Sequence, residues 1–346
     1  MIEVNHLTKT YGNHNAITDL TFQIEEGKIY GLLGPNGAGK STTMNIMTGC
    51  LAPTSGSVTI DGLDIYEDAM EAKKKIGYLP ELPPVYLNLT PLEYLTFVAK
   101  AKGVKRSEIK DQVAYAIAAT RLENYSKRLI KNLSKGYRQR VGVAQALIGN
   151  PQIIILDEPT VGLDPLQIIE IRDLIRDLGK NHTVILSSHI LSEVRSVCDH
   201  LIIIAKGKLV ANDTPENLER IFAAKSTVSI VVDGTQADCE KALSSIENLG
   251  PVLYTRNSDS TTTAVISIAP DYDINKKIFF AFSKAQKPIL SMTNSHVTLE
   301  DVFLELTTEK ESFGQPGAAA PQAESILEPA TSESGRSVAE TEEHHQ

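Results

Sequence analysis

The stretch that decides the fold reads Gly34-Pro35-Asn36-Gly37-Ala38-Gly39-Lys40-Ser41-Thr42. It matches every specified position of the phosphate-loop pattern G-x-x-x-x-G-K-S/T. Residues 28–33 read as a short apolar strand before it, and residues 42–47 read as the first turns of a helix after it. This is the strand–loop–helix context that the pattern requires, which argues against a glycine-rich turn without a ligand. The stretch predicts an α/β fold with a site for a nucleoside triphosphate.

The chemistry expected of residues 34–42 is phosphate binding by backbone amides. Glycines let N–H groups converge on the β- and γ-phosphates, and the following helix N-terminus adds a partial positive charge. Lys40 adds a full positive charge, and Ser41 offers a hydroxyl ligand for Mg²⁺. We therefore take all nine residues as candidates for nucleotide binding.

The length, hydrophobic content and cysteine positions of the chain restrict the class of protein to which it can belong. Its 346 residues are enough for two domains, and 42% hydrophobic content is ordinary for a globular protein. No run approaches the roughly 18 to 20 apolar residues of a membrane span, and the N-terminus lacks a signal-peptide pattern, so we expect a cytoplasmic protein. The cysteines Cys50, Cys198 and Cys239 are far apart and odd in number, and we expect them to pack in the core.

The net charge of −9 is unevenly distributed along the chain. Residues 308–346 hold eight Glu against one Lys and one Arg, a net of −6, which leaves −3 for the remainder. No basic stripe with interleaved aromatic residues stands out, which argues against a nucleic-acid partner. The composition of residues 308–346 predicts a disordered acidic tail.

Three regions are expected along the chain. Residues 1–224 alternate strands with helices, the pattern of a parallel sheet covered by helices, and their opening part predicts a small antiparallel layer. Residues 91–120 read as mostly helical. Residues 225–307 read as strand, helix, strand, strand, helix, strand, an order that fits a ferredoxin-like accessory domain, followed by a short helix capped by Thr298. The strands expected in the first region are 2–4, 20–24, 57–60, 153–156, 183–187, 201–204 and 208–210.

A second acidic motif follows the phosphate loop. Residues 153–158 read Ile153-Ile154-Ile155-Leu156-Asp157-Glu158, an apolar strand that ends in two acids. Asp157 can reach Mg²⁺ directly or through water, and Glu158 can accept a proton from an attacking water. A buried strand that happens to end in an acidic loop is the alternative, but the phosphate loop earlier in the chain argues against it.

Residues 133–140 supply the most specific resemblance. They read Leu133-Ser134-Lys135-Gly136-Tyr137-Arg138-Gln139-Arg140 and precede a helix expected over residues 141–148. A hydroxyl and backbone amides at a helix N-terminus imply a second surface that faces phosphate. The octet resembles the signature motif of ATP-binding cassette (ABC) ATPases, with Lys135 and Tyr137 in place of the commoner Gly and Gln. A serine-capped amphipathic helix is the plain alternative.

Further positions resemble the same family. Tyr11 resembles the aromatic residue that stacks on adenine, and His189 resembles the switch histidine that contacts the γ-phosphate. Gly162-Leu163-Asp164-Pro165 resembles the loop through which two subunits sense each other's sites. Glu81 stands where the family usually has Gln. A carboxylate can still ligate Mg²⁺ or orient water, but it adds a third negative charge beside Asp157 and Glu158.

The resemblance covers residues 1–307 and is closest to ATPases of the sodium-exporter and gliding-motility type. It implies a P-loop NTPase fold, ATP and Mg²⁺ as ligands, and an ATPase subunit at the inner face of the cell membrane, working with a polytopic ABC-2 permease. It also implies a homodimer in which residues 34–42 of one copy and Ser134 to Gly136 of the other enclose each ATP. The alternatives are a soluble mechanical ATPase acting on ribosomes or DNA, and a regulatory module that holds ATP without hydrolysing it.

Overall fold

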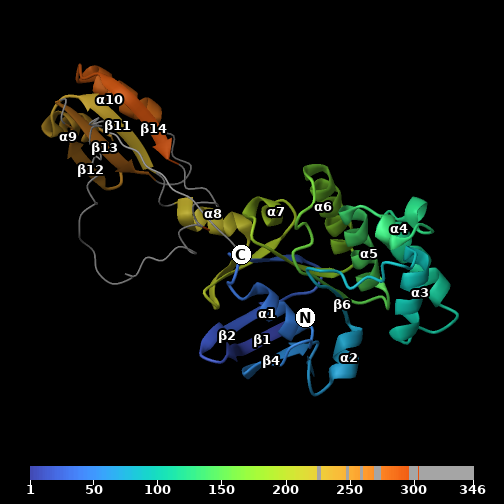
Figure 1. Ribbon diagram of the computed structural model, residues 1–346. Helices are drawn as coiled ribbons and strands as arrows, with labels where there is room; N and C mark the ends of the chain where they lie inside the picture. The colour runs from blue at the N-terminus through green and yellow to red at the C-terminus, as the bar shows by residue number, and fades with distance from the viewer. Residues whose placement is uncertain (224–226, 247–248, 258–259, 269–273, 296–302, 304–346) are drawn as a thin grey trace, which may run out of the picture. The chain divides into compact units, whose positions relative to one another are not determined.

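Figure 1 shows the ribbon of a computed structural model, which describes residues 1–223, 227–246, 249–257, 260–268, 274–295 and 303. The central sheet has six strands in the order β10-β9-β3-β8-β7-β6. All of its neighbouring pairs are parallel except β9 with β10, which is antiparallel. The strands are β3 (Ile29–Leu33), β6 (Ile76–Leu79), β7 (Ile153–Leu156), β8 (Thr183–Ser188), β9 (His200–Ala205) and β10 (Lys208–Asp213).

The inner strands of this sheet are buried on both faces. In β7, Ile153 and Ile155 belong to one hydrophobic core, while Ile154 and Leu156 belong to the other. Successive side chains of a strand point to opposite faces, so an unbroken apolar run suits a strand that is covered on both sides. The four apolar residues before Asp157 therefore fix that aspartate at the carboxyl end of a central strand.

An antiparallel layer covers one face of the central sheet and is drawn in blue in Figure 1. Its strand order is β2-β1-β4-β5, and its core also contains residues of α1 (Lys40–Met47) and of β3, β7, β8 and β9. A tight hairpin, with Gly12 and Asn13 in its turn, joins its first two strands. The strands are β1 (Ile2–Tyr11), β2 (His14–Ile24), β4 (Ser55–Ile60) and β5 (Leu63–Asp64).

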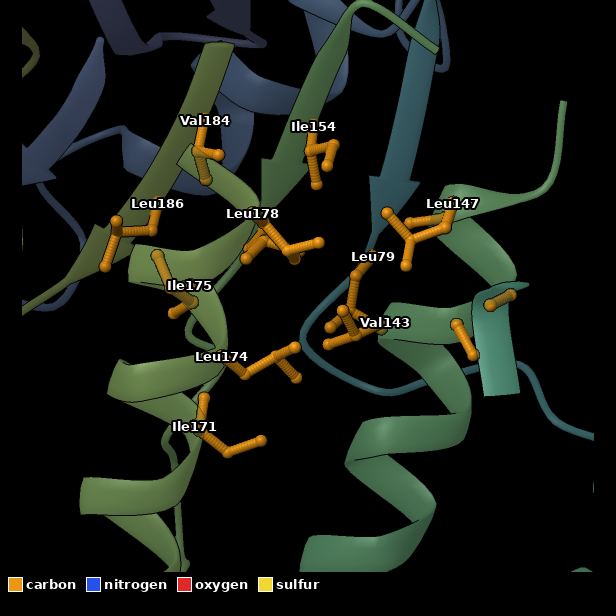
Figure 2. Close-up of a cluster of buried hydrophobic side chains, with 14 of the residues drawn as sticks. Leu79, Val143, Leu147, Ile154, Ile171, Leu174, Ile175, Leu178, Val184 and Leu186 are labelled. Atoms are coloured by element: carbon orange, nitrogen blue, oxygen red, sulfur yellow. The ribbon is translucent and has the colours of Figure 1, made fainter. Parts of the chain in front are cut away.

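Helices cover the other face. Figure 2 shows Ile171, Leu174, Ile175 and Leu178 of one helix, α6, directed toward Leu79, Val143 and the strands. Thr90 and Glu93 form a capping box at the start of α3, which also has Pro91 at its first position. The helical segments of the body are α2 (Ala69–Lys74), α3 (Pro91–Ala101), α4 (Ile109–Ala119), η1 (Glu123–Tyr125), η2 (Ile130–Asn132), α5 (Lys135–Leu147), α6 (Pro165–Gly179), α7 (Leu191–Arg195) and α8 (Pro215–Ala223).

A third sheet is formed by later residues and has a core of its own. Its strand order is β12-β13-β11-β14, every neighbouring pair is antiparallel, and its core includes Ile230, Ile266, Ile278 and Phe282. The element order is β11 (Thr227–Asp233), α9 (Gln236–Leu243), β12 (Val252–Arg256), β13 (Thr261–Ser267), α10 (Asn275–Lys284) and β14 (Ile289–Ser295). This confirms the strand and helix order expected from the sequence and gives the ferredoxin-like arrangement.

Some expectations need correction. The signature helix begins at Lys135 and not at residue 141, because Ser134 caps it and its Oγ accepts a hydrogen bond from the N–H of Tyr137. Cys50 is exposed, whereas Cys198 and Cys239 are buried as expected. The helix expected after Thr298, apart from Phe303, and the acidic tail lie outside the described residues. Within the described ranges, no helix is long and apolar enough to cross a membrane.

Candidate functional site

A cavity of about 640 Å³ opens beside the phosphate loop. It brings together residues of the hairpin β1–β2, the loop between β3 and α1, and the segments that follow β6, β7 and β8. Residues from distant parts of the sequence meet here because the carboxyl ends of parallel strands lie at one edge of the sheet. The lining residues are Tyr11, His14, Ala16, Asn36, Gly37, Ala38, Gly39, Lys40, Ser41, Thr42, Glu81, Glu158, Val161 and His189.

The phosphate loop packs closely against β2 just before α1 begins. Gly39 has φ +106°, and a Cβ at this position would lie 2.7 Å from the carbonyl oxygen of Ala16. Only glycine adopts such a conformation without cost, so the loop can approach the hairpin and the helix can begin at Lys40. The ammonium of Lys40 is buried and donates hydrogen bonds to the carbonyl oxygens of Gly34 and Pro35, at 2.9 and 3.3 Å. A concave loop with a buried cation fits a polyphosphate.

Side-chain oxygen atoms of the phosphate loop, of the residue after β7 and of β8 lie within hydrogen-bonding distance of one another. Ser41 Oγ donates a hydrogen bond to Asp157 Oδ1 at 3.2 Å, and Ser187 Oγ donates to the same oxygen at 2.6 Å. Mg²⁺ prefers oxygen ligands and is usually held by one or two carboxylates together with substrate phosphates. A hydroxyl and a carboxylate in contact, next to the cavity, fit a magnesium site.

Glu158 is held in an unusual backbone conformation. Its φ is +47°, a left-handed value that is uncommon for a residue other than glycine. The N–H of Glu158 donates to Ser187 Oγ at 2.8 Å, so one hydroxyl fixes both acids. The carboxylate is buried, with Oε1 3.4 Å from Lys40 Nζ and Oε2 3.0 Å from His189 Nδ1. A carboxylate between a lysine and a histidine at a cavity wall has the geometry of a general base.

A second buried acid supports this edge of the sheet. Glu193 in α7 accepts hydrogen bonds from Thr160 Oγ1 at 2.6 Å and from Ser188 Oγ at 3.3 Å. These contacts tie the segment after Glu158 to the segment that carries His189. Neither Glu193 nor Ser187 was expected to have a role from the sequence, although a hydroxyl pair at the end of a buried strand beside Asp157 was a usable signal.

The pKa of Tyr78 is affected by the nearby charge of Asp157. The ring is more than half buried in β6, and its hydroxyl donates to Asn45 Oδ1 at 3.2 Å. Burial raises the pKa of Tyr78 well above its usual range, and the negative charge of Asp157 raises it further. Tyr78 therefore stays a neutral hydrogen-bond donor to Asn45 in α1.

Tyr11, the last residue of β1, lines the cavity. Its ring is 49% exposed, and Lys9 Nζ lies 5.2 Å from the ring centroid. A flat ring that is open to solvent on the cavity wall suits stacking against a planar ligand. Glu81, which follows β6, and His189, which follows β8, also line the cavity.

Five of the expected site residues do not line this cavity. Gly34, Pro35 and Asp157 adjoin it through hydrogen bonds to Lys40 and Ser41, whereas Ser134 and Gly136 lie elsewhere in the same chain. Ser134 and Gly136, at the N-terminus of α5, do not line the cavity that contains the phosphate loop. A Cβ at Gly136 would lie 2.5 Å from Gln167 Oε1 in α6, so the start of α5 packs against α6. The α5 N-terminus is thus linked to the helix that follows Glu158 and not to the phosphate loop of its own chain.

The phosphate loop, the acidic end of β7 and the adjacent histidine define a P-loop nucleoside triphosphatase. The family described as ABC transporter matches residues 17–161. The bacitracin transport ATP-binding protein BcrA of Bacillus licheniformis is 35% identical, and the match covers 88% of this chain and 97% of the relative. The linearmycin resistance ATP-binding protein LnrL of Bacillus subtilis (strain 168) is 30% identical, and the match covers 89% of this chain and 98% of the relative.

Solved structures agree with the sequence comparisons. A dimeric post-hydrolysis state of the ATP-binding cassette MJ0796 bound to ADP and Pi has a TM-score of 0.56 and 28% identity, and covers 62% of this chain and 98% of that chain. The chain belongs to the ABC transporter family of ATP-binding proteins. It is an ABC transporter ATPase, which binds ATP and hydrolyses it.

Proposed function

We propose that this chain is a separate ATPase subunit of an ABC-2 type exporter, and that two copies close on ATP to drive a membrane permease. Relatives named for bacitracin transport and linearmycin resistance align over almost their whole length and support a transporter role. In this proposal residues 1–224 form the nucleotide-binding domain, residues 225–307 an accessory domain, and the chain is peripheral to the inner face of the membrane.

The observation that carries the proposal is the position of Glu158 between Lys40 and His189. Lys40 and the amides of residues 36–42 bind the phosphates, and Tyr11 stacks on the adenine. Glu158 accepts the proton of the attacking water, while His189, 3.0 Å from this carboxylate, orients it and contacts the γ-phosphate. Ser41 and Asp157, with Glu81 beside them, would hold Mg²⁺, which when bound neutralises charge on the phosphates.

A second copy of the chain completes each site. Ser134 and Gly136 offer a hydroxyl and backbone amides at the N-terminus of a thirteen-residue helix, a favourable place for an anion. They lie outside the cavity of their own chain, so we place them over the γ-phosphate held by the other copy. Bound ATP then joins the two copies, and hydrolysis releases them.

An exposed apolar surface near α3 provides a contact for the permease. Tyr86, Leu87 and Phe97 are each about half exposed, and the rings of Tyr86 and Phe97 lie 5.4 Å apart. A contiguous apolar patch on an otherwise polar surface marks an interaction site. Co-purification with a polytopic membrane protein would support this partner, and co-purification with ribosomes or DNA would favour a soluble mechanical ATPase.

The central test is the variant Glu158→Gln, which keeps the size of the side chain and removes the base. It should bind ATP, accumulate as a closed dimer and hydrolyse ATP at least about 1,000-fold more slowly. Size-exclusion chromatography with ATP and a phosphate-release assay measure the two effects. Undiminished hydrolysis would remove Glu158 from its role.

A mixing experiment tests the composite site. Lys40→Ala and Ser134→Arg chains should each be inactive alone, because both sites of either homodimer carry a defect. In a mixture, each heterodimer has one intact site, so about a quarter of the wild-type activity should return. Failure to recover any activity, with both variants folded and able to dimerise, would contradict the head-to-tail arrangement.

A further inference from the structure

One segment differs sharply in charge from the rest of the chain. Residues 275–294 contain four Lys and no Asp or Glu, although the whole chain carries a net charge of −9. The same segment holds three of the chain's eight Phe, at positions 279, 280 and 282. It forms α10 and the edge strand β14 of the third sheet.

The helix separates these residues onto two faces. Ile278 and Phe282, four positions apart, are fully buried in the core of the third sheet. Lys276, Phe280 and Lys284 share the same four-residue spacing and therefore form a stripe on the outer face. Phe280 is 67% exposed, so the apolar residue of this stripe lies between two lysines and faces solvent.

Two more apolar side chains extend the stripe toward β14. Phe279 is 57% exposed and Leu290 in β14 is 58% exposed, and the rings of Phe279 and Phe280 lie 5.6 Å apart. An open groove of about 730 Å³ runs between α10 and β14 beneath these side chains. We call Lys276, Phe279, Phe280, Lys284 and Leu290 the basic–aromatic face. Lys287 is excluded because it pairs with Asp238 of α9 at 3.1 Å.

We propose that the basic–aromatic face binds the surface of an anionic lipid bilayer. Lysines on a helix attract the negative headgroups of the cytoplasmic leaflet, and aromatic tips between them insert at the boundary of headgroups and acyl chains. Charge complementarity between the lysines of this face and anionic headgroups, together with two rings that are each more than half exposed beside them, favours a bilayer. The surface is separate from the nucleotide cavity and goes beyond the proposed transport function.

The test is sedimentation of the full chain with vesicles, without nucleotide or permease. Vesicles in which roughly a third of the lipid is phosphatidylglycerol should bind the protein at least about tenfold better than vesicles of pure phosphatidylcholine. Because the lysine contribution is electrostatic, the difference should shrink in high salt. Equal binding to both vesicles, or binding to neither, would overturn the proposal.

Two variants separate the contributions of charge and aromatic insertion. Lys276→Gln with Lys284→Gln should weaken binding to anionic vesicles about 25-fold, or about fivefold per lysine. The matched control is Lys105→Gln, just before α4, with Lys110→Gln in the first turn of α4. It removes the same charge and should bind as the wild type. An equal loss in the control would attribute binding to net charge and contradict the proposal.

The aromatic contribution is measured with Phe280→Ala, and its control is Tyr115→Ala in α4, which removes another exposed aromatic side chain. Phe280→Ala should weaken binding about tenfold at low and high salt alike, while Tyr115→Ala should have no effect. Retention of the wild type by an immobilised acidic peptide, with no vesicle binding, would assign the face to a protein partner instead. All these variants should hydrolyse ATP at the wild-type rate, so failed vesicle binding would leave the ATPase assignment intact.

Discussion

Removing one hydroxyl, in Ser187→Ala, should slow ATP hydrolysis without weakening ATP binding. Ser187 Oγ donates to Asp157 Oδ1 at 2.6 Å and accepts from the N–H of Glu158 at 2.8 Å, and all three residues are buried. Losing a hydrogen bond to a carboxylate and leaving a buried N–H unpaired should together lower the free energy of unfolding by about 3 kcal/mol.

The catalytic effect follows from the strained backbone of Glu158. A left-handed conformation of a residue other than glycine costs about 1–3 kcal/mol and persists only where its surroundings enforce it. Without the acceptor at Ser187 the backbone of Glu158 can relax, and its carboxylate moves away from the position opposite His189. A displacement of about 1 Å can cost about 100-fold in rate, so kcat should fall by that order.

The assay is phosphate release at saturating ATP, together with a fluorescent-nucleotide titration and denaturant unfolding. ATP affinity should stay within about twofold of wild type, because the phosphate loop does not depend on this hydroxyl. Thr120→Ala is the control, since it removes a buried hydroxyl that donates to the carbonyl oxygen of Ala116 at 2.7 Å and is not among the residues that line the cavity. A wild-type kcat in Ser187→Ala, despite lower stability, would refute the reasoning.

The sequence predicts much of the fold because its signals are local. The phosphate loop lies between a short apolar run and a helix start, and the structure confirms that order with β3 and α1. The run of four apolar residues before Asp157 predicts a strand buried on both faces, which β7 confirms. The strand and helix order of the third sheet was also predictable from alternating apolar residues and turns.

Other features were not predicted, most of them because they depend on contacts between distant residues. The helix start at Lys135 was missed because Gly136 is a weak helix former, whereas the Ser134 cap and packing against α6 override that preference. The role of Ser187 arises only when β7 and β8 pair side by side. Glu193 is a charged residue in a five-residue helix, and nothing local distinguishes it from an exposed acid. The roles assigned to the site residues and the limits of the domains stay predictions.

Three further changes test the site and the stability of the fold. Lys40→Ala should weaken ATP binding about 10- to 100-fold in a fluorescent-nucleotide titration, because it removes a buried charge from the phosphate loop, and normal affinity would contradict that assignment. Glu193→Gln should lower kcat about tenfold with unchanged ATP affinity, since its charge holds Thr160 and Ser188 together; an unchanged kcat would make Glu193 dispensable for catalysis. The third change concerns Asp61, whose pKa is lowered to about 2, mainly by the hydrogen bond from Lys75 Nζ at 2.6 Å. Because the pKa is depressed in the folded state, its stabilising contribution is present above about pH 4 and is lost as the pH falls toward about 2. Solvent screening limits the contribution to about 1 kcal/mol. Urea unfolding of wild type and Asp61→Asn should therefore differ at about pH 5 and converge at about pH 2, and a difference that persists at the lower pH would show that the ion pair is not its source.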